Sequence, residues 1–342
     1  MATWQDIRAL RAAPPGRAGQ GGARQKTFSA ALQQAQELAA AADHSGYASK
    51  PILLFYALSQ ASRALCAVRL DENWVRSGHG LSVPDRGDEL LDVRIKAAPA
   101  SHDLYHGVAQ AVEETPVRGE ASLGELWAAL PDLKDIPLPE EHWPRPLIAR
   151  TAVALEEAPD LSSQATSERL LLLIDGLGDL SSAEDLQAKL QSFPTLSNGS
   201  PASYPTGVAT GIMMNEEERN GVVYRRVILP IEMFPVVQLD VSGSRIQDHV
   251  DVFRSAAPGG VEDQKDLRWI NPGVGSPSQV LGPLSSWWTV LFILSSVARY
   301  QPALWGKALD VDRSPIAIGL ERVLDRAQEV LPHYVLASLR PE

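Results

Sequence analysis

The feature that most constrains the fold is a run of 19 residues without a charge, 280–298, near the end of the chain. Its length approaches the roughly 20 apolar residues that a membrane helix needs. However, Gly282, Pro283 and several serines dilute the run, and its tryptophan pair lies inside it, whereas membrane proteins place tryptophan at the interfaces. We therefore expect a helix over residues 283–300 that is buried on nearly all sides within the protein, and no membrane partner.

A second apolar helix is expected near the other end, over residues 52–68. Pro51 precedes it, where the missing N–H of proline is harmless, and the segment is apolar around most of its circumference. Because each apolar helix has more apolar surface than one neighbour can cover, we expect the two to pack together. Further helices are expected over residues 3–11, 26–43 and, with Ser314 as N-cap, up to residue 331.

The middle of the chain has a different pattern. Residues 82–145 are rich in Pro, Gly and acidic residues, and only 123–130 look helical. Strands are then expected at 147–155, 169–174 and 236–241, with a hairpin that pairs 208–215 with 222–229 and turns near Asn220-Gly221.

These patterns predict an α+β protein, mainly a helical bundle built from both chain ends, with a β-rich central insertion. A length of 342 residues is compatible with about two domains. The expected parts are an N-terminal helical part at 1–81, an irregular connecting region at 82–145, the β-rich insertion at 146–260 and a C-terminal helical part at 261–342.

Composition narrows the classes of function. Against 42 Asp and Glu there are only 31 Lys and Arg, so the net charge of −11 argues against a generally basic surface for nucleic acid or anionic membrane. The single cysteine, Cys66, excludes a disulfide framework and multi-cysteine metal sites. No phosphate loop or His-Glu-x-x-His motif occurs, and we expect no cofactor and no metal. The first residues lack a signal pattern, which predicts a cytoplasmic location.

Four sequence blocks carry a resemblance to a known family: KPILLFY at 50–56, RAL at 63–65, GHGL at 78–81 and ARYQPALW at 298–305. Together they resemble the YaaC-like family of bacterial proteins. The resemblance covers the two helical ends, and the β-rich middle only by its position. It implies a fold and no particular biochemical activity.

Several polar residues interrupt or end the apolar helices and are candidate ligand-binding residues: Lys50, Tyr56, Arg63, Arg299 and Tyr300. A buried arginine needs an acceptor or an anionic ligand, because isolated burial of charge is costly. Either these residues form a pocket for phosphate or carboxylate, or the arginines pair with carboxylates or cap helix carbonyls.

His79 is the candidate catalytic residue. It lies between Gly78 and Gly80, which let the backbone turn sharply and expose the imidazole, as suits a general base, a ligand contact or a plain loop. Other patterns are weaker. Arg326 and His333 have the spacing of HEPN-type ribonucleases, but chance supplies about 1.5 such matches and Pro332 is expected to end the helix before His333.

Three functions remain open. The first is a non-catalytic binding or scaffold module that contacts another protein or a second copy of the chain. The second is a nucleic-acid-directed effector, of the HEPN ribonuclease or antiviral defence kind, and the third is an enzyme acting on a small anionic metabolite. The acidic charge favours the first and third. Convergence of the candidate residues in an open cleft would favour a site, and internal carboxylate partners would favour a scaffold.

Overall fold

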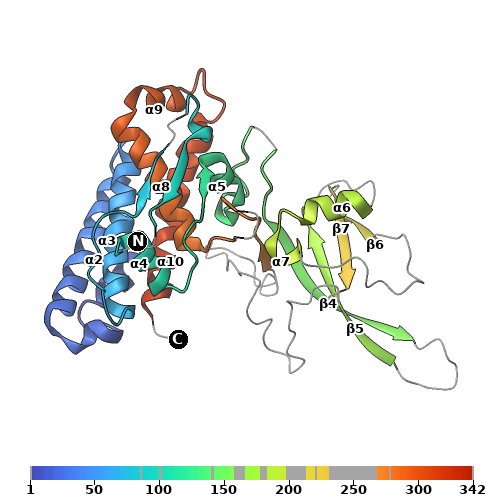
Figure 1. Ribbon diagram of the computed structural model, residues 1–342, viewed down its shortest axis with the longest axis horizontal. Helices are drawn as coiled ribbons and strands as arrows, with labels where there is room; N and C mark the ends of the chain where they lie inside the picture. Colours follow the sequence, from blue (N-terminus) through green and yellow to red (C-terminus); the bar gives the residue numbers. More distant parts are fainter. Residues whose placement is uncertain are drawn as a thin grey trace. The chain divides into compact units, whose positions relative to one another are not determined.

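The computed structural model describes residues 2–84, 87–99, 102–139, 142–157, 166–177, 183–197, 213–219, 222–230, 268–276 and 279–340. The chain divides into two compact units. One contains residues 1–144, 256–258 and 274–342, and the other contains 145–255 and 259–273. Both chain ends build the first unit, in which the blue helices near the N-terminus lie against the orange helices near the C-terminus (Figure 1). The predicted helix-dominated α+β class is confirmed.

Helix α3 (Lys50–Arg69) is at the centre of the first unit. It packs against α2 (Gly22–Asp43), α4 (Leu104–Ala111), α8 (Pro283–Tyr300) and α10 (Ala317–Leu339). The predicted contact between the two apolar helices is therefore confirmed. In the described part of the chain, α3 is the one helix with the length and apolar composition of a membrane span, yet 72% of that window is buried inside the protein. Packing in a protein core accounts for its hydropathy.

Helix α8 begins and ends where the sequence predicts, and it is buried without interruption from Leu284 to Val297. Helix α1 (Ala2–Ala9) and helix α5 (Leu123–Ala129) also lie close to their predicted positions.

Helix α10 differs from the prediction at both ends. It continues through Pro332 to Leu339, and its N-cap is Ile316, so the expected stop at residue 331 and the expected Ser314 cap are wrong. An interior proline costs about 3 kcal/mol. Burial of apolar side chains beyond it, such as Val335 and Leu339, contributes about 1.5–3 kcal/mol each and offsets that cost.

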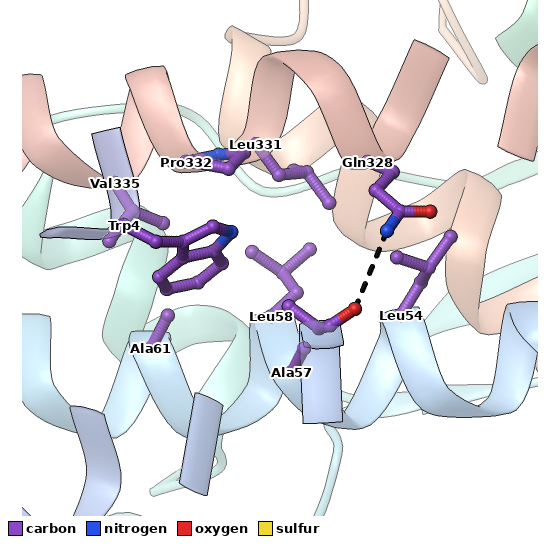
Figure 2. A pocket seen from close by; sticks show the side chains of 10 residues that line it. Trp4, Leu54, Ala57, Leu58, Ala61, Gln328, Leu331, Pro332 and Val335 are labelled. Atoms are coloured by element: carbon purple, nitrogen blue, oxygen red, sulfur yellow. Dashed lines mark hydrogen bonds between the residues drawn. The ribbon is translucent and has the colours of Figure 1, made fainter. Parts of the chain in front are cut away.

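Pro332 itself lies in an apolar crevice between α10, α3 and the first helix (Figure 2). Trp4, Leu58 and Leu331 line this crevice with it. The free space is about 10 Å³, which is room for one water at most. The crevice therefore has no free room for a ligand larger than a water molecule.

The first unit also contains elements that the sequence did not predict. Asp103 caps α4, and its side chain accepts a hydrogen bond from the His106 amide at 2.9 Å. Helix α9 follows α8 at Pro302–Leu309. Its described residues also form an antiparallel sheet of order β1-β2-β3 and three 3-10 turns: β1 (Leu81–Ser82), β2 (Arg94–Ala97), β3 (Glu120–Ser122), η1 (Gly16–Gln20), η2 (Leu90–Asp92) and η3 (Pro131–Leu133).

In the part that the structure describes, the second unit contains an antiparallel five-stranded sheet of order β6-β7-β5-β4-β8 with two helices. Its elements are β4 (Leu147–Glu157), β5 (Thr166–Asp175), β6 (Met213–Arg219), β7 (Val222–Pro230), β8 (Arg268–Ile270), α6 (Ala183–Leu190) and α7 (Pro194–Ser197). Arg219 pairs with Val222, so the predicted hairpin is confirmed, with its first strand at 213–219. Residues 208–212, Asn220-Gly221 and the strand expected at 236–241 lie outside the described residues.

Candidate functional site

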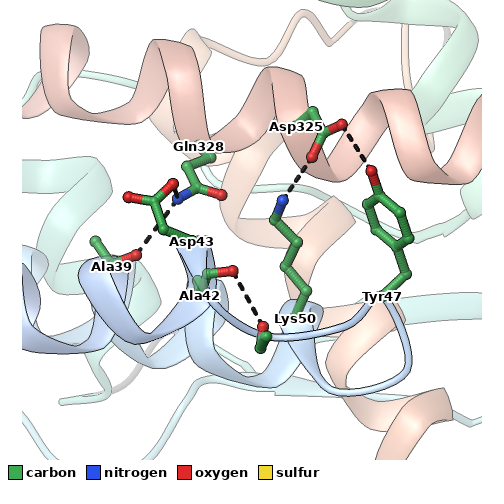
Figure 3. Close-up of polar contacts among 8 residues, drawn as sticks. Ala39, Ala42, Asp43, Tyr47, Lys50, Asp325 and Gln328 are labelled. Carbon is green, nitrogen blue, oxygen red and sulfur yellow. Dashed lines mark hydrogen bonds and ion pairs between the residues drawn. The ribbon is translucent and has the colours of Figure 1, made fainter. Parts of the chain in front are cut away.

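Lys50 is joined to α10, not to the other candidate residues. Its Nζ lies 2.5 Å from Asp325 Oδ1, and the Tyr47 hydroxyl donates to Asp325 Oδ2 at 2.9 Å (Figure 3). The Lys50 side chain is 9% exposed. In the same view, Gln328 donates hydrogen bonds to Asp43 and to the Ala39 carbonyl. These contacts tie the turn between α2 and α3 to α10.

Four of the other candidates lie together. Arg299 Nη1 donates to the Tyr56 hydroxyl at 3.0 Å. The guanidinium carbon lies 5.6 Å from the centroid of the Tyr56 ring and 4.9 Å from that of Tyr300. The rings of Tyr56 and His79 are 6.2 Å apart. Tyr56, His79, Arg299 and Tyr300 thus form one aromatic cluster around a cation.

Neither Arg63 nor Arg299 has a carboxylate partner among the residues that the structure describes. Arg63 Nη1 donates to the Arg76 carbonyl at 2.9 Å. Arg299 Nε donates to the Ser295 carbonyl at 3.1 Å. Of the alternatives, carboxylate partners are thus absent among the described residues, and Arg299 instead bonds a carbonyl of its own helix, the kind of contact that the capping alternative expects. A carbonyl oxygen carries no formal charge, so neither contact neutralises an arginine.

The two glycines beside His79 are both required by the backbone. Gly78 has φ +68° and Gly80 has φ +78°, so the predicted sharp turn is present. A Cβ atom on Gly80 would lie 1.9 Å from Asp103 Oδ1, because the loop passes directly over the cap of α4. His79 is thereby fixed against the helices.

His79 is half-buried, with its ring edge-on to Phe55 at 5.2 Å and 6.1 Å from Phe292. Burial and, secondarily, the positive charges of Arg299 and Arg63 lower the pKa of His79 below 6.5. The imidazole is therefore neutral near pH 7. Its Nδ1 atom is buried and has no hydrogen-bond partner among the described residues.

A cavity of about 180 Å³ adjoins this cluster, and it is lined by Val83, Phe292, Ser296, Val297, Tyr300 and Gln301. A water needs roughly 10–15 Å³ on the same scale, so there is room for about a dozen. Of these residues, only Tyr300 is a candidate that the sequence predicts. The available signal was the spacing of Ser296, which lies four residues from both Phe292 and Tyr300 and therefore shares a face of α8 with them.

The remaining reactive side chains have other surroundings. Cys66 is completely buried, and burial raises the pKa of its thiol to about 12. The His106 ring lies 2.8 Å from Asp103, and no group of three potential metal ligands occurs in the part of the chain that the structure describes. Trp305 is buried and donates to the Ala48 carbonyl, as a packing anchor does.

Arg326 and His333 both lie on α10, because the helix passes through Pro332. The prediction that Pro332 ends the helix before His333 is therefore wrong. However, Arg326 pairs with Glu329 at 3.0 Å, and His333 Nε2 lies 3.4 Å from the Thr3 hydroxyl. Each side chain already has a partner within the first unit.

The fold and the cluster define an α+β protein whose helical unit is closed by both chain ends and carries an aromatic–arginine cluster beside a cavity. The YaaC-like protein family matches residues 11–339, so the chain belongs to that family. No curated protein and no solved structure matches the chain.

Proposed function

We propose that the protein is a non-catalytic binding module that holds a small molecule in the cavity beside the C-terminal end of α8. The observation that supports this function is that the Ser296 hydroxyl lines the cavity without a hydrogen-bond partner among the described residues. The residue is 8% exposed and lines the cavity, yet its hydroxyl has no hydrogen-bond partner in the described part of the chain. The Ser296 hydroxyl is not among the fully buried unpaired polar atoms of the described residues, so it is accessible from the cavity. A ligand in the cavity could accept or donate a hydrogen bond at this hydroxyl in place of water.

Two features favour binding over catalysis. A catalytic base is oriented by a third group, whereas His79 Nδ1 lacks such a partner among the described residues. Cys66 is buried as a neutral thiol, while a nucleophilic cysteine needs an accessible thiolate.

An enzyme acting on a small anionic metabolite is the alternative that a specific observation favours. The lowered pKa of His79 keeps the imidazole in the neutral form that a general base needs near pH 7. A nucleic-acid-directed ribonuclease or defence function has no comparable support. That function, the cytoplasmic location, the bacterial origin and a protein or self partner stay predictions.

The test is a thermal-shift screen of small molecules against the full chain and two variants. Ser296→Leu extends a side chain into the cavity, and Ser29→Leu makes the same change on α2, outside the cavity lining. We expect compounds that raise the melting temperature of the wild type and of Ser29→Leu but not of Ser296→Leu. Compounds that shift all three proteins equally, or none that shift any, would contradict the proposed function.

A further inference from the structure

The cavity and a cation share one face of α8. Phe292, Ser296, Arg299 and Tyr300 stand at positions i, i+4, i+7 and i+8, which lie on the same side of a helix. Tyr300 lines the cavity, and its ring is 4.9 Å from the guanidinium carbon of Arg299. Arg299 is not itself a lining residue, so its charge is one side chain removed from a ligand in the cavity, across Tyr300.

The guanidinium of Arg299 has N–H groups that make no hydrogen bond in the described structure. A guanidinium carries five N–H groups. In the described structure, one is used by the Ser295 carbonyl and one by the Tyr56 hydroxyl. Three remain, including both on Nη2, and an oxyanion accepts such hydrogen bonds in pairs. The rings of Tyr56 and Tyr300 hold the guanidinium in place, so little conformational freedom is lost on binding.

The rest of the lining is suited to a flat apolar group. Val83, Phe292 and Val297 supply apolar wall, and Tyr300, which is 65% exposed overall, lines the cavity with a side chain whose ring also contacts Arg299. Ser296 and Gln301 add two polar side chains without hydrogen-bond partners in the described part of the chain.

Building on the proposed binding function, we infer that the ligand is a small monocarboxylic acid with a flat apolar body, whose carboxylate binds Arg299. Among the residues that the structure describes, Arg299 is the cation that contacts a lining residue, while Arg63 bonds the Arg76 carbonyl, which is not part of the lining. His79 is neutral near pH 7. A monoanion matches this charge, whereas a phosphate dianion would remain only partly compensated.

Four probes separate the features of such a ligand, with dissociation constants measured by ligand-observed NMR on the full chain. Benzoate has both the charge and the flat body, benzamide lacks the charge, acetate lacks the body, and phenyl phosphate replaces the carboxylate. We expect benzoate to bind at least about tenfold more tightly than each of the other three, as a charge-assisted hydrogen-bond pair predicts.

Three variants assign the effect to Arg299. Arg299→Gln should reduce benzoate binding to the level of benzamide. Tyr56→Phe keeps the ring but removes the hydroxyl that holds the guanidinium, and it should weaken benzoate binding severalfold. Arg313→Gln makes the same charge change at an exposed surface position and should bind like the wild type. Melting curves of each variant show that it is folded.

The outcomes distinguish this inference from the proposed function. Equal affinity for benzamide, tighter binding of phenyl phosphate, or benzoate binding that persists in folded Arg299→Gln would each overturn the carboxylate inference. The binding function would survive those results if Ser296→Leu abolished the same binding. If none of the four probes binds, the carboxylate inference is wrong, and the thermal-shift screen separately decides the binding function.

Discussion

The carboxyl group of Glu114 fills the space beside Gly282 at the start of α8, where a Cβ atom on residue 282 would lie 2.3 Å from the carboxyl carbon. Glu114 Oε2 accepts a hydrogen bond from the Ser285 amide at 2.7 Å, and Oε1 accepts one from the Leu284 amide at 3.1 Å. These amides belong to the first turn, which has no intrahelical partners for its N–H groups. The negative charge also meets the positive end of the helix dipole.

Gly282→Ala should therefore destabilise the protein by about 1–2 kcal/mol, because the added methyl displaces the carboxylate and removes the cap. Gly306→Ala is the matched control. Gly306 lies in α9 with open space where a Cβ would stand, so alanine should stabilise by about 0.5–1 kcal/mol. Urea unfolding measures both changes, and effects of the same sign would contradict this account of Gly282.

The glycines beside His79 make a second matched pair. Both have positive φ, but a Cβ on Gly78 meets nothing within 4 Å, whereas one on Gly80 collides with Asp103. Gly78→Ala should cost only the backbone strain, about 1–2 kcal/mol. Gly80→Ala should cost clearly more and should also disturb the cap of α4. Equal losses in thermal melts would show that the loop does not press on Asp103.

Variants of Lys50 and Asp325 test whether Lys50 serves in an ion pair or binds a ligand. Asp325→Asn leaves a buried ammonium without its counterion and should cost about 1–3 kcal/mol, less than a fully buried pair because Asp325 is half exposed. Lys50→Met removes the charge with its partner still in water and should cost less. Neither change should alter benzoate binding. Loss of binding in folded Lys50→Met would restore Lys50 as a ligand residue.

His79 should make stability depend on pH. In the unfolded chain its imidazole takes up a proton as pH falls through 6.5, whereas the folded chain does so only at a lower pH, because burial and then Arg299 and Arg63 lower the pKa. The free energy of unfolding therefore decreases as pH drops from 6.5 to that lower pKa. His79→Gln should lose less stability between about pH 7.5 and about pH 5.5. An equal loss in urea unfolding would rule out this linkage.

The sequence predicts α3 and α8 well because an apolar run with a proline in its first turn is a local signal for a buried helix. The position where α10 ends is not determined by a local sequence signal. Pro332 is a stop signal by itself, and only tertiary burial of the residues beyond it keeps the helix intact.

The candidate site was predictable in part for the same reason. Arg299 and Tyr56 are conspicuous as polar residues on apolar helices. By contrast, the cavity depends on which side of α8 is left uncovered beside Val83, and that is a property of packing. Lys50 could not be separated from the site by sequence, because its partner Asp325 lies 275 positions away.

The burial of Cys66 has a practical consequence. It is the only cysteine of the chain, it is completely buried on α3, and its thiol is protonated at neutral pH. A thiol reagent can reach it only when α3 separates from its neighbours. The labelling rate of the wild-type protein therefore measures how often the helical unit opens, while the sheet unit contributes no signal.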